Sequence, residues 1–297
     1  MALAGVLSAV RELILDVEEI PLTLEERRTT YHKMIPTLSS LEVDDLAKIP
    51  PEQVKTYTSC IYNGERSTLK SHFPMTLKVL ERSWKGVYKT DFDSLALTKR
   101  LQRTRPWRGN TTEYLAQNFV DYVGEDLREL ALAFPEAIEL ARMEFISLQI
   151  RRIKEENAKS KPLAPSDLTK LTVTDLLALN FAIPQTTFLE EFRVNVVEVY
   201  KNFRESDEVS VPIAFEPVFA VGSRTADNYL RWQAIPSNIF NFLKSTPYRK
   251  PTEISDLAGA YSDIADPSCS EEELFSGFFN LLVSLMVSRV VVVHGAF

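Results

Sequence analysis

The sequence predicts an α+β fold, with a helical N-terminal domain followed by a winged-helix-like α/β C-terminal domain. Apolar residues recur at helical spacing in the first half, whereas β-branched and aromatic residues gather in short runs in the second half. Between them, residues 158–167 read AKSKPLAPSD, a polar stretch without apolar periodicity that is typical of a linker. The predicted domains are therefore residues 1–157 and 168–297, and residues 1–50 are an extension of the first.

The helices of the first half follow from local capping and proline signals. The first twenty residues predict an amphipathic helix rather than a signal peptide, because charged residues interrupt the apolar run. Thr23 and Glu26 form a capping-box pattern for the next helix, and Pro74 stands at a favoured first-turn position. Further helices are expected over 52–70, 74–89, 91–104, 111–123 and a long segment that begins at Pro135.

The second half combines strand patterns with further helices. The run FRVNVVEVYKNF (192–203) is rich in β-branched and aromatic residues, and residues 210–224 are similar but contain Pro212 and Pro217. We expect these two runs to be strands of one small sheet, with edge positions or bulges at the prolines. Helices are expected over 236–245, 253–264 and 271–288, and a last strand over 290–294.

The sequence contains few residues in patterns that indicate catalysis, metal binding or phosphate binding. No pair among the three histidines and two cysteines has the spacing of a metal motif, and Cys60 and Cys269 are expected to be buried free thiols. The sequence has no Gly-x-Ser-x-Gly and no glycine-rich phosphate loop. We therefore expect no catalytic residue, no metal site and no cofactor in this chain.

One predicted helix carries three carboxylates, at Glu136, Glu139 and Glu144. No Glu-x-x-His accompanies them, so the pattern does not indicate a di-iron bundle. Glu139 and Arg142 are three residues apart, a spacing at which they can pair on the helix surface.

Positive charge is concentrated in one part of an acidic chain. The formal net charge is -7, yet residues 66–108 hold 11 basic and 3 acidic side chains, a net of +8. This stretch is compatible with a solvated helix face on which Trp84 and Tyr88 pack inward, with a protein or peptide partner, or with nucleic acid. The candidate partner-binding residues are Arg100, Arg103, Arg105, Trp107 and Arg108.

The predicted strand at 192–203 offers a second kind of site. An exposed strand edge can accept an extended peptide through main-chain hydrogen bonds. Prolines, lysines and glutamates can instead blunt such an edge. Alternate side chains of the strand would face the peptide, and the candidate peptide-binding residues are Phe192, Val194, Val196, Glu198 and Tyr200.

Several runs resemble one known family. They are CIYNGERSTLKSHFPMTLKVL, DFDSLAL, YLAQNFVDYV and AFPEAIELARMEFISL, and together they resemble the helical domain of the HvfC/BufC-like proteins, whose domain name refers to DNA binding. The resemblance covers residues 54–152 and continues loosely beyond them. This chain has Leu80 and Glu81 where the family often has Gly, and Phe145 where it often has Trp. The matching positions are Tyr62, Asn63, Phe73, Pro74, Phe92, Phe119, Tyr122, Leu140, Ala141, Glu144 and Phe145.

The resemblance implies a non-catalytic partner subunit. A cytoplasmic location is expected from the residues themselves, because Arg289 interrupts the apolar run of residues 281–293, which is also too short to span a membrane. Proteins of this family accompany TIM-barrel multinuclear iron oxidases that modify cysteines in ribosomally made peptides, and the partners of the methanobactin and thiaglutamate pathways are closest in layout. The resemblance implies that the iron belongs to the enzyme and that the second domain takes the precursor's leader as an extra strand. The alternative is a DNA-binding transcriptional regulator. Neither reading involves a membrane.

Overall fold

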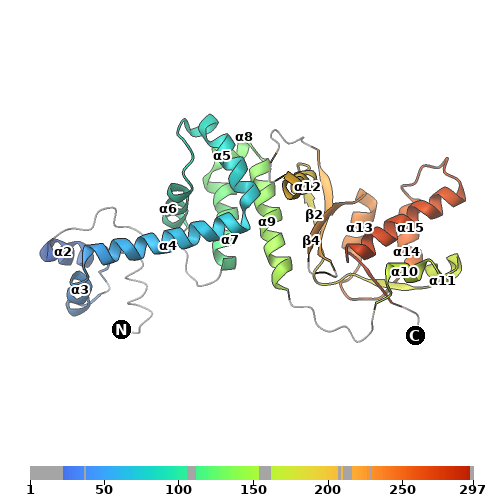
Figure 1. Cartoon of the computed structure of the whole chain (residues 1–297), viewed down its shortest axis with the longest axis horizontal. Coiled ribbons are helices and arrows are strands. Elements are labelled where there is room, and N and C mark those ends of the chain that lie inside the picture. Colours follow the sequence, from blue (N-terminus) through green and yellow to red (C-terminus); the bar gives the residue numbers. More distant parts are fainter. Residues whose placement is uncertain are drawn as a thin grey trace. The chain divides into compact units, whose positions relative to one another are not determined.

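The chain forms an α+β fold that divides into two compact units, Met1–Ala133 and Phe134–Phe297 (Figure 1). The computed structural model describes residues 23–36, 38–105, 112–153, 162–206, 209, 216–225, 227 and 229–294. The division falls before the long helix α9 (Glu136–Arg152) and not at residues 158–167, because α9 packs against the sheet of the second unit.

The first unit is helical, as expected, and the helices predicted over 52–70, 74–89, 91–104 and 111–123 are confirmed with shifts of a few residues at their ends. The last of them continues into a short π-helix, which the sequence did not indicate. The elements are α2 (Leu24–Met34), α3 (Ser40–Ala47), α4 (Pro51–His72), α5 (Pro74–Tyr88), α6 (Ser94–Thr104), α7 (Thr112–Asp121), η1 (Tyr122–Asp126) and α8 (Arg128–Ala133).

The helices α2 and α3 lie at the N-terminal end of α4 (Figure 1). Each begins with a capping box, Thr23 with Glu26 and Ser39 with Glu42, in which the two residues satisfy each other's backbone N–H groups. A small core that includes Tyr31 joins both helices to the first turn of α4. The helices α2 and α3 of the extension therefore dock on this chain itself. The helix expected in the first twenty residues lies outside the described residues.

The second unit contains two antiparallel three-stranded sheets, in the orders β5-β1-β6 and β2-β3-β4. The three helices predicted over 236–245, 253–264 and 271–288 and the last strand are confirmed. The elements after α9 are α10 (Pro165–Leu168), α11 (Val173–Leu177), β1 (Asn180–Ala182), β2 (Phe188–Phe192), α12 (Val196–Ser206), β3 (Val218–Arg224), β4 (Leu230–Ala234), α13 (Ser237–Ser245), β5 (Thr252–Glu253), α14 (Ile254–Ser262), α15 (Glu271–Val287) and β6 (Val292–His294).

The strand expected over 192–203 is wrong. The chain leaves the sheet after Phe192, and Asn195 starts α12 by accepting the backbone N–H of Glu198 at 3.2 Å. The three valines of α12, Val196, Val197 and Val199, are buried along one side of the helix, where packing outweighs their preference for strands. The second expected strand, 210–224, is confirmed only over β3, and Pro212 lies outside the described residues.

The sheet β2-β3-β4 is covered on both faces. On one face, α9 and α12 pack against it, and Trp232 of β4 donates from Nε1 to Ser147 Oγ of α9 at 2.9 Å. The Trp232 ring also lies against Gly222 of β3 and 5.6 Å from the Phe192 ring, measured between ring centroids. A Cβ atom at Gly222 would lie only 2.8 Å from this ring, so the close packing requires glycine.

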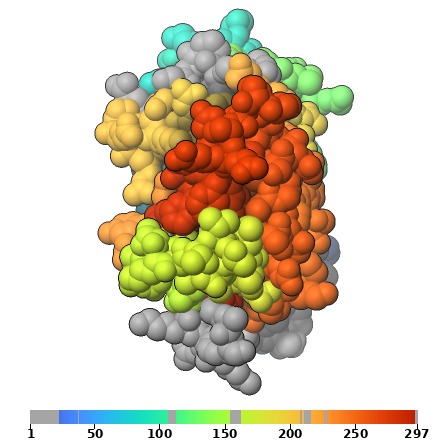
Figure 2. All heavy atoms as spheres, turned by 90° about the vertical axis from the view of Figure 1, so that its right-hand side faces the viewer, coloured from blue at the N-terminus to red at the C-terminus, as the bar shows by residue number. Residues whose placement is uncertain are grey.

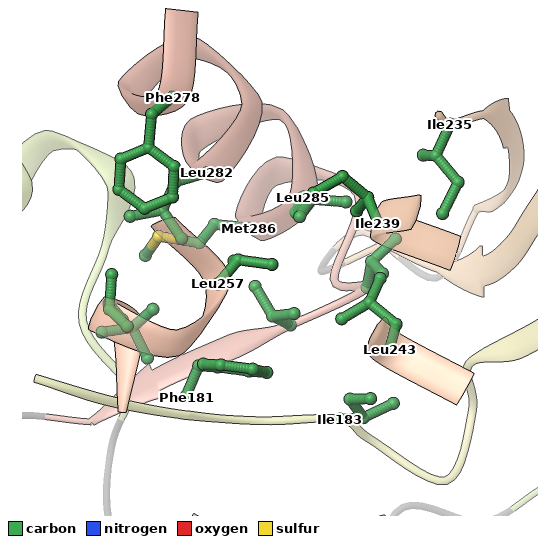
Figure 3. Close-up of a cluster of buried hydrophobic side chains, with 14 of the residues drawn as sticks. Phe181, Ile183, Ile235, Ile239, Leu243, Leu257, Phe278, Leu282, Leu285 and Met286 are labelled. Carbon is green, nitrogen blue, oxygen red and sulfur yellow. The ribbon is translucent and has the colours of Figure 1, made fainter. Parts of the chain in front are cut away.

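On the other face, the sheet borders the main apolar core of the unit. Side chains of α13, α14 and α15 converge there on Phe181 of β1 and on Ile183 (Figure 3). Figure 2 shows α10 and α11 (yellow-green) beside α15 (red), and they close this core from outside. The core contains Leu257, Phe278 and Leu282, all of which are buried.

Gly222→Ala should destabilise the second unit, because the added Cβ forces the Trp232 ring out of its position. We expect the free energy of unfolding to fall by about 1–3 kcal/mol, measured by urea denaturation of the full chain. Gly259→Ala is the matched control, since a Cβ there meets no atom within 4 Å and alanine favours the helix by up to about 1 kcal/mol. Equal stabilities of the two variants would contradict the close contact.

Candidate functional site

Among the described residues, β2 is an edge strand that pairs with β3 alone. β2 pairs with β3 from Phe188 opposite Gly222 to Phe192 opposite Val218. Within the described ranges, no other segment forms backbone hydrogen bonds with β2. Its outward amide and carbonyl groups are therefore positioned to bind an added strand.

The opposite edge of this sheet is partly covered. The carbonyl of Leu230 in β4 accepts hydrogen bonds from the Tyr200 hydroxyl at 3.0 Å and from Arg204 at 3.3 Å. Both donors lie on α12, which packs on β4. The two edges of the sheet thus differ, because side chains of α12 bind a carbonyl group of β4.

Charged groups fix β2 against α9. Arg142 donates to Glu139 at 2.9 Å and to Glu190 of β2 at 3.1 Å, and its guanidinium lies 5.6 Å from the centre of the Phe192 ring. The expected pair of Glu139 and Arg142 is confirmed, although Glu139 is buried and not on the helix surface. Burial raises the pKa of Glu139, and the charges of Arg142 and Arg193 act in the opposite direction.

The five candidate peptide-binding residues do not share one face of a strand. Phe192 ends β2, and Phe192, Val194 and Val196 are buried, so they cannot face a bound peptide. Glu198 is exposed on α12, where Tyr200 holds the edge of β4. The edge strand is instead Phe188–Phe192, which contains only Phe192 of the five candidates.

The structure places the arginines of the basic stretch in different surroundings. Arg100 and Arg103 are exposed on α6, whereas Arg105 turns back toward three carboxylates of the same unit. Arg105 lies 3.8 Å from Asp121 and 2.5 Å from Glu125, and it also contacts Asp126. These ion pairs raise the pKa of Arg105, with the hydrogen bond to Asp126 as the largest cause. Trp107 and Arg108 lie outside the described residues.

The π-helix η1 explains how one arginine reaches these carboxylates. In an α-helix, residues five apart point about 140° away from each other. A π-turn has its hydrogen bond between residues five apart, so Asp121 and Asp126 come onto the same side. The backbone N–H of Leu127 donates to the carbonyl of Tyr122 at 3.0 Å in this turn. The end of α6 is further tied to α7 by the side chain of Asn118, which donates to the Arg105 carbonyl at 3.3 Å.

The aromatic residues beside the basic stretch form a cluster. The centroid of the Trp84 ring lies 4.5 Å from that of Tyr88 and 5.5 Å from that of Phe92. All three rings remain partly exposed. Burial raises the pKa of Tyr88, while the nearby Arg100 acts in the opposite direction. Deeper burial raises the pKa of Tyr122 in η1 to about 12.

The remaining candidate residues are the histidines, the cysteines and the carboxylates of α9. Among the residues that the structure describes, no group of three His, Cys, Asp or Glu side chains could hold a metal ion. Glu136, Glu139 and Glu144 are all buried along α9. The expectation of buried thiols is wrong, because Cys60 and Cys269 are both exposed. No described helix combines the length and the apolar character needed to cross a membrane.

Comparison with known proteins adds no relative. No family model matches the chain, and no curated protein matches it.

Arg105→Ala should weaken the helical unit, because it leaves three neighbouring carboxylates without their common counter-ion. We expect a loss of about 1–2 kcal/mol in the free energy of unfolding at low salt, measured by urea denaturation, and a smaller loss in 1 M salt. Arg100→Ala is the control, since among the described residues this exposed arginine forms no ion pair. A cost no larger than that of the control would contradict a structural role for Arg105.

Glu136→Gln should stabilise the protein at neutral pH. Burial raises the pKa of Glu136 in the folded state, so folding favours the protonated carboxyl. The free energy of unfolding therefore falls as the pH rises from the ordinary carboxyl pKa through the raised one. The stabilising effect of glutamine should be present at pH 7 and absent at about pH 3.5.

The pH-dependent unfolding of Glu136→Gln can be compared with that of Glu205→Gln, which changes an exposed carboxylate on α12. A variant at Glu136 that gains nothing at pH 7 relative to low pH would show that burial of this carboxylate has no energetic cost.

Proposed function

We propose that this chain is a non-catalytic partner subunit that holds an extended peptide on the edge of β2. The observation that supports the proposal is the open outer side of β2, held in place by the contacts of Arg142 with Glu139 and Glu190. An added strand would gain main-chain hydrogen bonds there without any change of fold. The side chains of alternate peptide residues would lie over the two faces of the sheet.

The resemblance to the HvfC/BufC-like proteins supplies the finer part of the proposal. In this reading, the peptide is the leader of a ribosomally made precursor, and the helical unit binds a TIM-barrel multinuclear iron oxidase in the cytoplasm. The winged-helix-like character of the second domain belongs to this proposal as well. The iron and the cysteine chemistry would be supplied by the partner enzyme, and this chain would position the substrate.

The alternative is a DNA-binding transcriptional regulator. The observation that favours it is the set of exposed basic side chains on α5 and α6, including Arg100 and Arg103. Arg105, however, is already neutralised by carboxylates of its own unit. Binding to a DNA duplex would weaken steeply as the salt concentration rises, which separates this alternative from peptide binding.

Hydrogen exchange can locate the bound peptide. The full chain would be mixed with a synthetic leader peptide of a candidate precursor, and amide exchange would be followed by mass spectrometry. We expect slower exchange in residues 188–192, because their outward amides gain partners, and unchanged exchange in β4 (Leu230–Ala234), which serves as the internal control.

Three results would contradict the proposal in different ways. Peptide binding without protection of β2 would place the capture site elsewhere on the chain. No binding of the peptide, and no complex with an iron oxidase, would refute the partner-subunit function. Salt-sensitive binding of a DNA duplex in place of the peptide would favour the regulator.

A further inference from the structure

The hydrogen bonds between β3 and β4 determine which backbone groups of β3 are left for β2. The Ile235 amide donates to the Phe219 carbonyl at 2.9 Å at one end of this pair. At the other end, the Thr225 amide donates to the Tyr229 carbonyl at 2.8 Å. Both bonds continue the register of β3 and β4, so the odd-numbered residues of β3 point toward β4. The even-numbered residues of β3 therefore point toward β2.

This alternation fixes the outward-facing groups of β2. Phe188, Glu190 and Phe192 lie opposite even-numbered residues of β3, so their N–H and C=O groups point toward that strand. The N–H and C=O groups of Leu189 and Glu191 consequently point away from the sheet. An added strand can thus form main-chain hydrogen bonds at two positions of β2 that are separated by one residue.

The outward-facing segment is bounded at both ends. Before it, the Thr187 amide donates to the Pro184 carbonyl at 3.1 Å. After it, the chain leaves the sheet at Phe192 and enters α12. The added strand is therefore held by the backbone of Leu189 and Glu191, and these two residues define the register of a bound peptide.

The side chains of Leu189 and Glu191 lie on one face of the sheet. Glu190 between them bonds to Arg142 of α9, so α9 covers the opposite face. Leu189 packs against the apolar core that α13, α14 and α15 form. Glu191 is exposed opposite Phe219 of β3, and among the described residues it forms no hydrogen bond or ion pair.

Charge favours a basic occupant of this edge. The second unit, residues 134–297, holds 16 basic and 22 acidic side chains, a net of -6. A basic side chain opposite Glu191 forms a favourable cross-strand pair, whereas an acidic one is repelled. A second copy of β2 is disfavoured for the same reason, because it would bring the Glu190 and Glu191 carboxylates of both strands together. Beside Leu189, an apolar peptide side chain would extend the core.

We propose that β2 binds a basic peptide segment in antiparallel orientation, with Lys or Arg opposite Glu191 and an apolar residue opposite Leu189. In an antiparallel strand, the basic residue comes first and the apolar residue follows two positions later. The described strands of both sheets pair antiparallel, and this pairing is slightly the more stable. The inference rests on the proposed function, because it names the class of peptide that the β2 edge holds.

The first test uses the full chain and three fluorescein-labelled peptides of equal length. Each consists of Thr and Ser except at its centre, which is Lys-Thr-Leu in the first, Glu-Thr-Leu in the second and Leu-Thr-Lys in the third. Binding is followed by fluorescence anisotropy. We expect the Lys-Thr-Leu peptide to bind about fivefold more tightly than either of the others.

A charge reversal in the protein should reverse this preference. With Glu191→Lys, we expect the Glu-Thr-Leu peptide to bind more tightly than the Lys-Thr-Leu peptide. Glu205→Lys is the matched control, since it makes the same change at an exposed residue in the last turn of α12, which packs on β4. It should keep the original preference and change each affinity less than about twofold.

Methylation of peptide amides tests the register independently of charge. In the proposed pairing, the amides of the peptide's Lys and Leu face β2, whereas the amide of the central Thr faces away. N-methylation at Lys or Leu should therefore weaken binding about tenfold, because a carbonyl of β2 loses its donor. N-methylation at the central Thr is the matched control and should have a smaller effect.

The inference is overturned by absent binding of the Lys-Thr-Leu peptide, by equal binding of the Lys and Glu peptides, or by an unchanged preference in Glu191→Lys. Equal losses from all three methylations would overturn the register. The hydrogen-exchange experiment with the leader peptide is independent of these results. Protection of residues 188–192 by the leader, without any preference for Lys, would reject the basic segment and leave peptide capture standing.

Discussion

The packing of Trp232 against Gly222 is the contact on which the second unit depends. Trp232 is buried, and its ring fills the space that a side chain at position 222 would occupy. Its indole N–H reaches Ser147 on α9, and its ring meets Phe192 at the end of β2. One side chain therefore joins all three strands of the sheet to the helix that covers them. β3 is the central strand and pairs with β2, so the contact that fixes β3 also fixes the position of β2.

Charged groups also hold β2 against α9. Arg142 is placed by its helix directly over the edge strand, where it bridges a buried carboxylate of α9 and a carboxylate of β2. Glu139 would be costly to bury alone, and the guanidinium offsets that cost while holding the strand against the helix. An edge strand that is fixed on one side loses little further freedom when it accepts another strand, which favours peptide binding.

The helical unit shows how two arginines five residues apart acquire different roles. Arg100 lies within α6 and is exposed. Arg105 is the C-cap of the same helix, where the chain changes direction and the side chain can turn back toward η1. In an α-helix, Asp121 and Asp126 would point in different directions. The π-turn of η1 lets both reach the guanidinium of Arg105. An exposed arginine and an arginine engaged within the fold thus stand five residues apart in one basic run.

The sequence by itself determined the α+β class and the positions of most helices, since caps, prolines and apolar spacing act between residues a few positions apart. The Asn195 and Glu198 cap was equally local and could have indicated α12, but the valines of that run favour a strand until their buried face is known. Only the tertiary structure decided that β2 is an open edge and that Arg105 is engaged. Both depend on residues that lie far apart along the chain. Arg105 is 16 to 21 positions from its carboxylates, and β2 is about 30 positions from β3. These residues meet only when the helices and strands pack.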